Sequence, residues 1–358
     1  MSGSSMSLSL ARGGLCLVAF LAGLGGVGRT IRELLPFPDV MLVKPKIDYF
    51  AEHHDDYDTL FLGSSRIYYQ VIPALFDRLS AEKGAATKSF NAAIAGMRPP
   101  EDAFYLDSLL RHPPRHLRWV FIELSFFRIA VDRDEVGTVR AVYWHDLPRL
   151  WLLLKRALEV KPGGKKRIWR KELEVRLTPL GDFVEHLPLF FKNQTNIGRG
   201  SILTSRLIYA KLRPPAPFWA TLGEDLAGWI PTGRPETMSD AEQQEYEKVL
   251  AARRAQPPRR DVGDPVSQEA LELMLSKIEK LGATPVLIVP PTTNKRNFYP
   301  SPERAKKTIV LDFCDPEKFP VLYESRYRLD TDHLNAEGSK IFTELIVKEW
   351  AERMKRRQ

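Results

Sequence analysis

The hydrophobic positions group into short runs near both ends of the chain, bounded by glycine, proline or polar residues. Three runs of strand length lie in the first part of the chain: 57–62, 89–95 and 119–124. Helical patterns follow the first two runs, one at 71–82 and one that begins after Pro99-Pro100, which suit a helix start. Strands that alternate with helices predict an α/β domain with a parallel sheet.

The same alternation returns after residue 266. The expected elements are a helix at 268–281, strands at 284–289 and 309–313, and a final helix at 336–354. Between the two parts, at 132–265, the periodic pattern is lost. We therefore predict a three-layer α/β/α sandwich built from 57–131 and 266–358, with 132–265 as a large insertion after the third strand that caps the active-site edge.

The N-terminal region carries a different pattern, a nearly uncharged apolar run at 13–28. Its length approaches that of a short membrane span, and no clear cleavage site follows it. We expect residues 1–28 to form a signal-anchor or transmembrane segment; the alternatives are a cleaved signal peptide and a buried core helix. Residues 29–56 are expected to be a tether, with His53 and His54 in solvent.

The insertion contains two features of its own. The pattern at 148–160 predicts an amphipathic helix, and 161–171 form a basic run with one tryptophan. These features are typical of a solvated helical face and loop, or of a contact with a membrane surface or an anionic glycan.

The composition narrows the classes of function. The net charge of +8 is typical of a soluble protein with some attraction to anionic membranes or acidic polymers. No nucleic-acid-binding motif is present, so we expect no nucleic-acid partner. The two cysteines, Cys16 and Cys314, give the core no disulfide and no zinc-ligand spacing. We expect neither a metal nor an organic cofactor.

Candidate chemistry begins where the first strand stops, at Gly63-Ser64-Ser65. Glycine permits a tight turn there, and a turn at the carboxyl end of a parallel strand lies where open α/β sheets bind ligands. A serine needs a neighbouring base to become a nucleophile, although a helix cap is the commonest role of a turn serine. Ser65 is the preferred nucleophile and Ser64 its competitor.

The candidate base is His333, in Asp330-Thr331-Asp332-His333 near the other end of the chain. A carboxylate three residues earlier can reach the ring Nδ1–H and direct Nε2 toward the serine. Asp332, as the direct neighbour of the histidine, is expected to point elsewhere. We therefore favour Asp330 over Asp332 as the orienting acid.

Taken together, the Gly-x-Ser turn and the Asp-x-x-His loop resemble the first and last blocks of the SGNH (GDSL-like) hydrolases, over 57–128 and 266–350. The Gly-Ser-Ser variant looks like that of membrane-anchored acyltransferase-like proteins of cell-wall and exopolysaccharide modification. The resemblance implies a flavodoxin-like topology, with Ser65 as nucleophile, Asp330 as orienting acid and His333 as base. It also implies a catalytic domain outside the cytoplasm.

The same resemblance implies an oxyanion hole formed by the Ser65 N–H, by Gly96 and by an asparagine after the third strand. That asparagine is absent, since the chain has Leu124-Ser125-Phe126 there. Ser125 is the tentative substitute, with Arg128 and Asn91 as alternatives. The nearby Glu123 is expected to be a buried, paired acid.

These features predict a membrane-tethered serine-type esterase or O-acyltransferase. Its substrate would be an acyl ester, such as an acetyl ester, of a small molecule or an envelope glycan. The alternative is a catalytically degenerate SGNH fold that serves as a binding or scaffold subunit among envelope-assembly proteins; the absent asparagine favours it. A third hypothesis, a plain soluble lipase, is opposed by the apolar run at 13–28.

Overall fold

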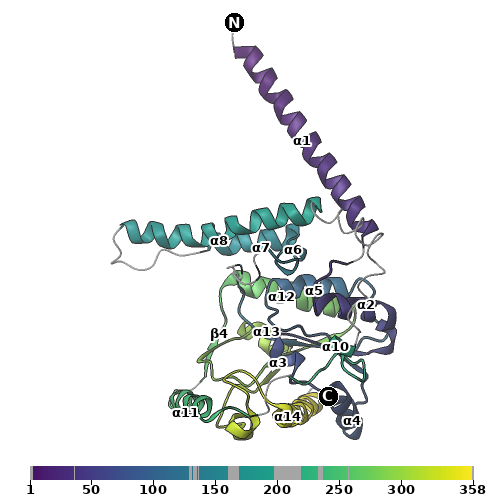
Figure 1. The fold of residues 1–358 in the computed structure, drawn as a ribbon, viewed down its shortest axis with the longest axis vertical. Helices are drawn as coiled ribbons and strands as arrows, with labels where there is room; N and C mark the ends of the chain where they lie inside the picture. Colours follow the sequence, from purple (N-terminus) through teal and green to yellow (C-terminus); the bar gives the residue numbers. More distant parts are fainter. Residues whose placement is uncertain are drawn as a thin grey trace. The chain divides into compact units, whose positions relative to one another are not determined.

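The computed structural model describes residues 3–35, 37–128, 131, 135, 137–159, 169–196, 219–232, 237–256 and 258–356. The chain forms two compact units (Figure 1). One contains Met41–Arg128 and Ala216–Gln358 and is called the sheet unit; the other contains Met1–Val40 and Ile129–Pro215 and is called the helical unit. The candidate active-site residues all lie in the sheet unit.

The sheet unit is built around five parallel strands. They are β1 (Thr59–Leu62), β2 (Ser89–Asn91), β3 (Trp119–Glu123), β5 (Thr284–Val289) and β7 (Ile309–Asp312). Their order across the sheet is β2-β1-β3-β5-β7, and every neighbouring pair is parallel. Strands β1, β3, β5 and β7 consist mostly of apolar residues, because a parallel sheet is covered on both faces. The predicted α/β fold is confirmed.

Helices cover the two faces of this sheet. The larger ones are α2 (Val43–His53), α4 (Pro73–Glu82), α5 (Glu101–Leu109), α11 (Asp240–Arg254), α12 (Pro265–Lys280) and α14 (Ala336–Lys355). In Figure 1, α4 and α14 lie on one side of the sheet and α5 and α12 on the other. The three-layer sandwich expected from the sequence is therefore confirmed.

The packing on the α4 and α14 face is aromatic. Phe61 of β1 stacks on Phe121 of β3 with ring centroids 4.6 Å apart, and both rings meet Phe76 of α4 edge-on. Trp350 of α14 contacts Phe76 and Phe121 and is fully buried. Burying such rings contributes roughly 1.5–3 kcal/mol for each side chain, so this cluster fixes the two helices on the sheet.

Shorter elements complete the sheet unit. They are η1 (His54–Asp56), α3 (Ser65–Tyr68), α10 (Trp219–Leu222), β4 (Arg259–Asp261), β6 (Arg296–Phe298), α13 (Pro302–Lys307), η3 (Pro320–Tyr323) and η4 (Ser325–Tyr327). Strands β4 and β6 form a separate parallel pair. Two of these elements, α10 and β4, come together with α11 from 216–265, which was expected to belong to the insertion but which clusters with the sheet.

The segment expected to be a tether contains α2, which packs into the sheet unit. Lys46 of α2 is fully buried, and its Nζ donates to the carbonyl oxygens of Asn91, Ala93 and Gly228 at 2.7–2.8 Å. Burial lowers the pKa of Lys46, whereas three carbonyl acceptors match the three donors of an ammonium group. The lysine thus joins α2 to the end of β2, to the segment after it and to the loop after α10.

The helical unit contains α1 (Gly3–Leu34), α6 (Arg140–Tyr143), α7 (Leu147–Leu158) and α8 (Trp169–Thr195). Helix α7 corresponds to the amphipathic helix expected at 148–160, and its N-cap Asp146 accepts a hydrogen bond from the Arg149 N–H. The basic run at 161–171 lies outside the described residues as far as 168.

The transmembrane helix predicted within residues 1–28 is wrong. Helix α1 covers the apolar run at 13–28, but in the described part of the chain no helix combines the length and the apolar character needed to cross a membrane. The run has 16 residues, six of them glycine. At about 1.5 Å per residue it would extend about 24 Å, less than a hydrocarbon core of about 30 Å.

Candidate active site

The first half of the candidate site is the nucleophile turn, residues 63–66, which connects β1 to α3. A Cβ on Gly63 would come within 2.6 Å of the Glu123 carboxylate and of the Ile67 side chain, so only glycine fits. Ser64 then caps α3, since its Oγ accepts a hydrogen bond from the Arg66 N–H at 3.3 Å. This close packing places Ser65 at the first position of α3.

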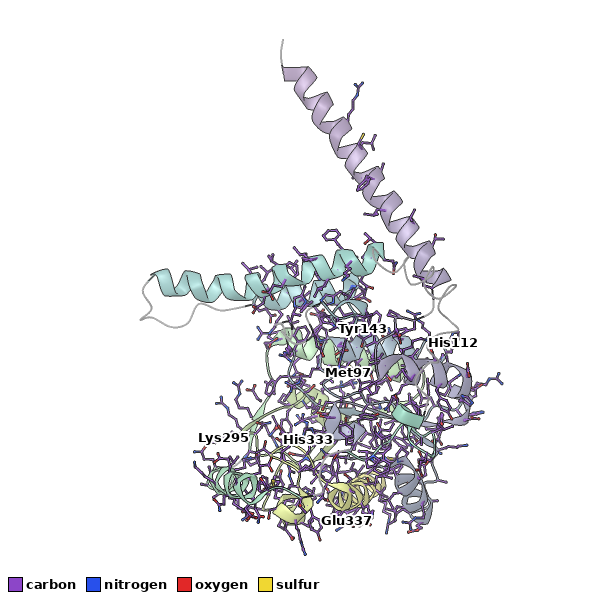
Figure 2. All side chains as sticks on the ribbon, viewed as in Figure 1. Met97, His112, Tyr143, Lys295, His333 and Glu337 are labelled. Carbon is purple, nitrogen blue, oxygen red and sulfur yellow. The ribbon has the colours of Figure 1, made fainter. Side chains whose placement is uncertain are left out.

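The second half is the acid–base loop, residues 328–334, which precedes α14. The Leu329 N–H donates to the His333 carbonyl at 2.9 Å, and Arg328 and Leu334 form an antiparallel bridge. Buried Arg328 donates to the backbone carbonyls of Asp330 (3.2 Å) and Thr331 (2.6 Å). The loop is therefore closed by its own backbone and fixed from inside by one guanidinium. His333 is labelled in Figure 2.

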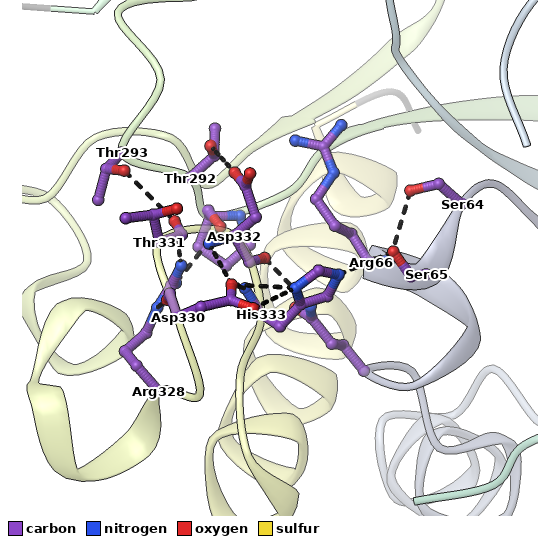
Figure 3. Close-up of polar contacts among 12 residues, drawn as sticks. Ser64, Ser65, Arg66, Thr292, Thr293, Arg328, Asp330, Thr331, Asp332 and His333 are labelled. Carbon is purple, nitrogen blue, oxygen red and sulfur yellow. Dashed lines mark hydrogen bonds and ion pairs between the residues drawn. The ribbon is translucent and has the colours of Figure 1, made fainter. Parts of the chain in front are cut away.

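The two halves meet through one hydrogen-bonded series (Figure 3). Ser65 Oγ lies 2.8 Å from Nε2 of His333. Nδ1 of the same ring lies 2.9 and 3.0 Å from the two carboxylate oxygens of Asp330. The structure thus brings together the three residues expected from the sequence, in the order that general-base activation of a serine requires.

Asp330 is arranged to remain ionised. Burial by itself would raise the pKa of its carboxyl, but the hydrogen bond from His333 and those from the backbone N–H groups of Asp332 and His333 outweigh it. The net result is a pKa well below the usual range. An ionised carboxylate on Nδ1 leaves the His333 Nε2 lone pair facing the serine hydroxyl.

Asp332 faces a different set of partners. Its Oδ1 accepts hydrogen bonds from Thr292 Oγ1 at 2.5 Å and from Asn294 Nδ2 at 3.2 Å. Its carbonyl accepts a hydrogen bond from Gln70 Nε2 at 3.3 Å. Asp332 therefore connects the acid–base loop to the segment after β5 and does not contact the imidazole ring.

Ser64 and Glu123 form a buried polar pair behind the nucleophile turn. The Ser64 N–H and Oγ donate to the Glu123 carboxylate at 2.7–3.0 Å. Arg66 donates to the same carboxylate through Nε at 2.9 Å and Nη2 at 2.5 Å. Glu123 is thus a buried, paired acid, and Ser64 is turned away from the histidine by these bonds.

The site opens into a cleft with a volume of about 160 Å³. Its lining includes Ser64, Ser65, Arg66, Gly96, Arg98, Leu124, Ser125, Phe126, Asn294, Arg296, Asn297, Phe298, Asp332 and His333. Gly96 and Ser125, both expected as oxyanion donors, therefore lie in the same cleft as Ser65 and His333. Gly96 has a φ of +76°, a conformation that suits glycine.

The two alternative oxyanion donors lie elsewhere. Asn91 is fully buried, and its Nδ2 donates to the carbonyls of Ile67 and Val71, which fastens the end of α3 to β2. Arg128 is not part of the cleft lining, and its N–H donates to the carbonyl of Pro99. Neither side chain takes the place of the absent asparagine.

Sequence reasoning missed several polar groups of the cleft, chiefly Arg66, Arg98 and Asn297. Arg66 directly follows the nucleophile, so its position next to Ser65 was readable from the sequence. Arg98 lies in the loop after β2 and Asn297 lies in strand β6, and only the fold brings these two residues close to Ser65. No group of three or more His, Cys, Asp or Glu side chains that could hold a metal occurs among the described residues.

Comparison with known proteins adds no relative to this picture. No protein-family model matches the chain, and no curated protein is similar to it at a significant level. The resemblance to SGNH hydrolases therefore stays a prediction from the sequence. Any functional proposal rests on the fold and on the geometry of the cleft.

Proposed function

We propose that the protein is a serine-type ester hydrolase or O-acyltransferase. The observation that carries the proposal is the series from Ser65 Oγ through His333 to Asp330, with distances of 2.8 and 2.9 Å, at an open cleft. A serine that only caps a helix needs no such partner. Ser64 already caps α3, which leaves Ser65 free for chemistry.

The geometry supports acyl transfer in two halves. In the first, Ser65 Oγ attacks the ester carbonyl carbon, its proton moves to His333 Nε2, and the C=O electron pair becomes an oxyanion. The oxyanion collapses, the C–O bond to the alcohol breaks, and the alcohol leaves with the proton from His333. In the second, water or a sugar hydroxyl repeats these steps on the acyl-enzyme.

The substrate proposed from the sequence resemblance is an acyl ester, such as an acetyl ester, of a glycan. The cleft is compatible with a sugar because it combines the rings of Phe126 and Phe298 with the amides of Asn294 and Asn297. Aromatic faces and amide groups supply the apolar contact and hydrogen bonds by which a few placed groups orient a ligand.

A fluorophosphonate probe tests the proposal on the full chain, because such probes react with serines activated by a neighbouring base. We expect labelling on Ser65, abolished in Ser65→Ala. Ser64→Ala is the matched control and should keep most of the labelling. A folded protein with neither labelling nor turnover of a small acetyl ester would overturn the proposal. Hydrolysis that is slow in water and accelerated by a sugar acceptor would identify a transferase.

A further inference from the structure

An ester hydrolase must stabilise the oxyanion that forms during attack, and this cleft lacks one expected donor. The Ser65 N–H and Gly96 are present, but Ser125 stands where the resemblance implies an asparagine. Removing one oxyanion donor from such a site typically costs about 10²–10³-fold in kcat. The following inference rests on the proposed function and concerns the group that replaces the asparagine.

The guanidinium of Arg66 is held rigidly beside the nucleophile. Its side chain is 17% exposed, whereas that of its partner Glu123 is 1% exposed. Glu123 is fixed in turn by the N–H and Oγ of Ser64. The guanidinium is therefore positioned by a buried carboxylate of β3.

Part of the Arg66 guanidinium remains available to donate hydrogen bonds to a ligand. A guanidinium has five N–H donors on Nε, Nη1 and Nη2. Nε and Nη2 donate to Oε1 of Glu123. In the part of the chain that the structure describes, Nη1 makes no hydrogen bond, and Arg66 lines the cleft together with Ser65 and His333. The Nη1 donors therefore belong to a guanidinium that Glu123 fixes next to Ser65.

From this geometry we infer that Arg66 is a catalytic residue whose Nη1 donates to the oxyanion of the tetrahedral intermediate, in place of the absent asparagine. Glu123 is then a positioning residue that sets the guanidinium. A charged donor aimed at developing negative charge stabilises it more than a neutral amide does.

The other two arginines of the cleft are less suited to this role. Arg296 is 63% exposed and pairs with Asp261 outside the cleft lining. Arg98 is exposed and, among the described residues, makes no side-chain hydrogen bond or ion pair that would fix it. Because oxyanion donors act through preorganisation, a mobile or distantly paired cation contributes less than a fixed one. The control is Arg78 of α4, which is 64% exposed, pairs with Glu82 and lies outside the cleft lining.

The first test compares Arg66→Gln with Arg78→Gln on one small acetyl ester. We expect kcat to fall about 10²–10³-fold in Arg66→Gln with KM changed less than threefold, because the lost contact forms only in the transition state. Arg78→Gln should keep kcat within threefold. A phenylboronic acid, which forms a tetrahedral adduct on the serine, should lose affinity in Arg66→Gln alone.

A second test separates catalysis from structure. Guanidinium ions added to Arg66→Ala, below the concentration that affects its circular dichroism, should restore part of kcat. The same ions should not accelerate Arg78→Ala. An active wild type together with an Arg66→Gln variant that keeps kcat within threefold would overturn this inference alone. A wild type without labelling or turnover would overturn it together with the proposed function.

Discussion

The nucleophile turn and the acid–base loop supply the two halves of the site, and their reacting residues lie 268 positions apart in the chain. The turn is held from β3 by a buried anion, Glu123, which accepts hydrogen bonds from Ser64 and Arg66. Ser65 lies between those two residues in the chain, so the contacts of Ser64 and Arg66 with Glu123 also fix the position of Ser65.

The acid–base loop is held by a buried cation of the opposite sign. Arg328 is fully buried and donates to four carbonyl oxygens, those of Pro291, Leu322, Asp330 and Thr331. Its guanidinium also lies 5.7 Å from the ring centroids of Tyr246 and Tyr323. This arrangement fixes backbone atoms, whereas Glu123 also binds a side chain that faces the cleft.

The difference shows two ways to preorganise a reacting group. A buried carboxylate can align the N–H groups and the cationic side chain of a tight turn by accepting their hydrogen bonds. A buried guanidinium can fix a loop that has no regular secondary structure by donating hydrogen bonds to several of its carbonyl oxygens. Because each half has its own buried charge, a substitution in one half should leave the geometry of the other intact.

The largest expected effect comes from removing the charge of the orienting acid while the acid–base loop stays in place. In Asp330→Asn the imidazole loses its orienting carboxylate and can adopt the wrong tautomer, so turnover should fall about 10⁴-fold. Asp332→Asn is the matched control, because Asp332 bonds to Thr292 and not to the ring; it should cost less than tenfold. Steady-state kinetics and probe labelling measure both. Equal losses in the two variants would contradict the assignment of Asp330.

The second effect concerns the buried cation itself. Arg328→Met leaves four carbonyl oxygens without this donor, and a buried unsatisfied polar group costs roughly 1–3 kcal/mol. We expect the free energy of unfolding to fall by about 3 kcal/mol or more in urea denaturation. Arg326→Met, two residues earlier, is the control, since Arg326 is 69% exposed and pairs with Glu324; it should stay within about 0.5 kcal/mol. A similar small change in both variants would show that Arg328 is not what holds the loop.

Much of the sheet unit could be predicted because its signals are local. Four of the five strands of the main sheet are short runs of mostly apolar residues. The Asp330–His333 spacing places both side chains on one loop. The location of the site at the carboxyl ends of the strands follows from the parallel topology of the sheet. The sequence could not show contacts between residues that are distant in the chain. Examples are the hydrogen bond from Lys46 to the carbonyl of Gly228, 182 residues away, and the hydrogen bond from the Ser64 N–H to Glu123.

Two errors in the sequence reading have identifiable causes. The helix expected at 71–82 is present as α4 (Pro73–Glu82), but the short α3 that precedes it was not expected; it forms because Ser64 caps a turn directly after β1. The apolar run at 13–28 was given a membrane role from its lack of charge, although its glycines and its length fall short of a span. Both errors come from weighing composition above the positions of capping and small residues.

The smallest expected effect is the acid dependence of stability at Asp330. Hydrogen bonds hold the pKa of this carboxyl below its value near 4 in the unfolded chain. The ionised group therefore stabilises the fold above pH 4, and this contribution is lost as the pH falls through the folded pKa. Asparagine cannot be protonated in this range, so the Tm of the wild type should fall relative to that of Asp330→Asn between pH 5 and pH 2. The carboxylate is 33% exposed and partly screened by water, so we expect a change of about 1 kcal/mol or less. Parallel Tm curves for the two proteins across this range would show that Asp330 keeps an ordinary pKa.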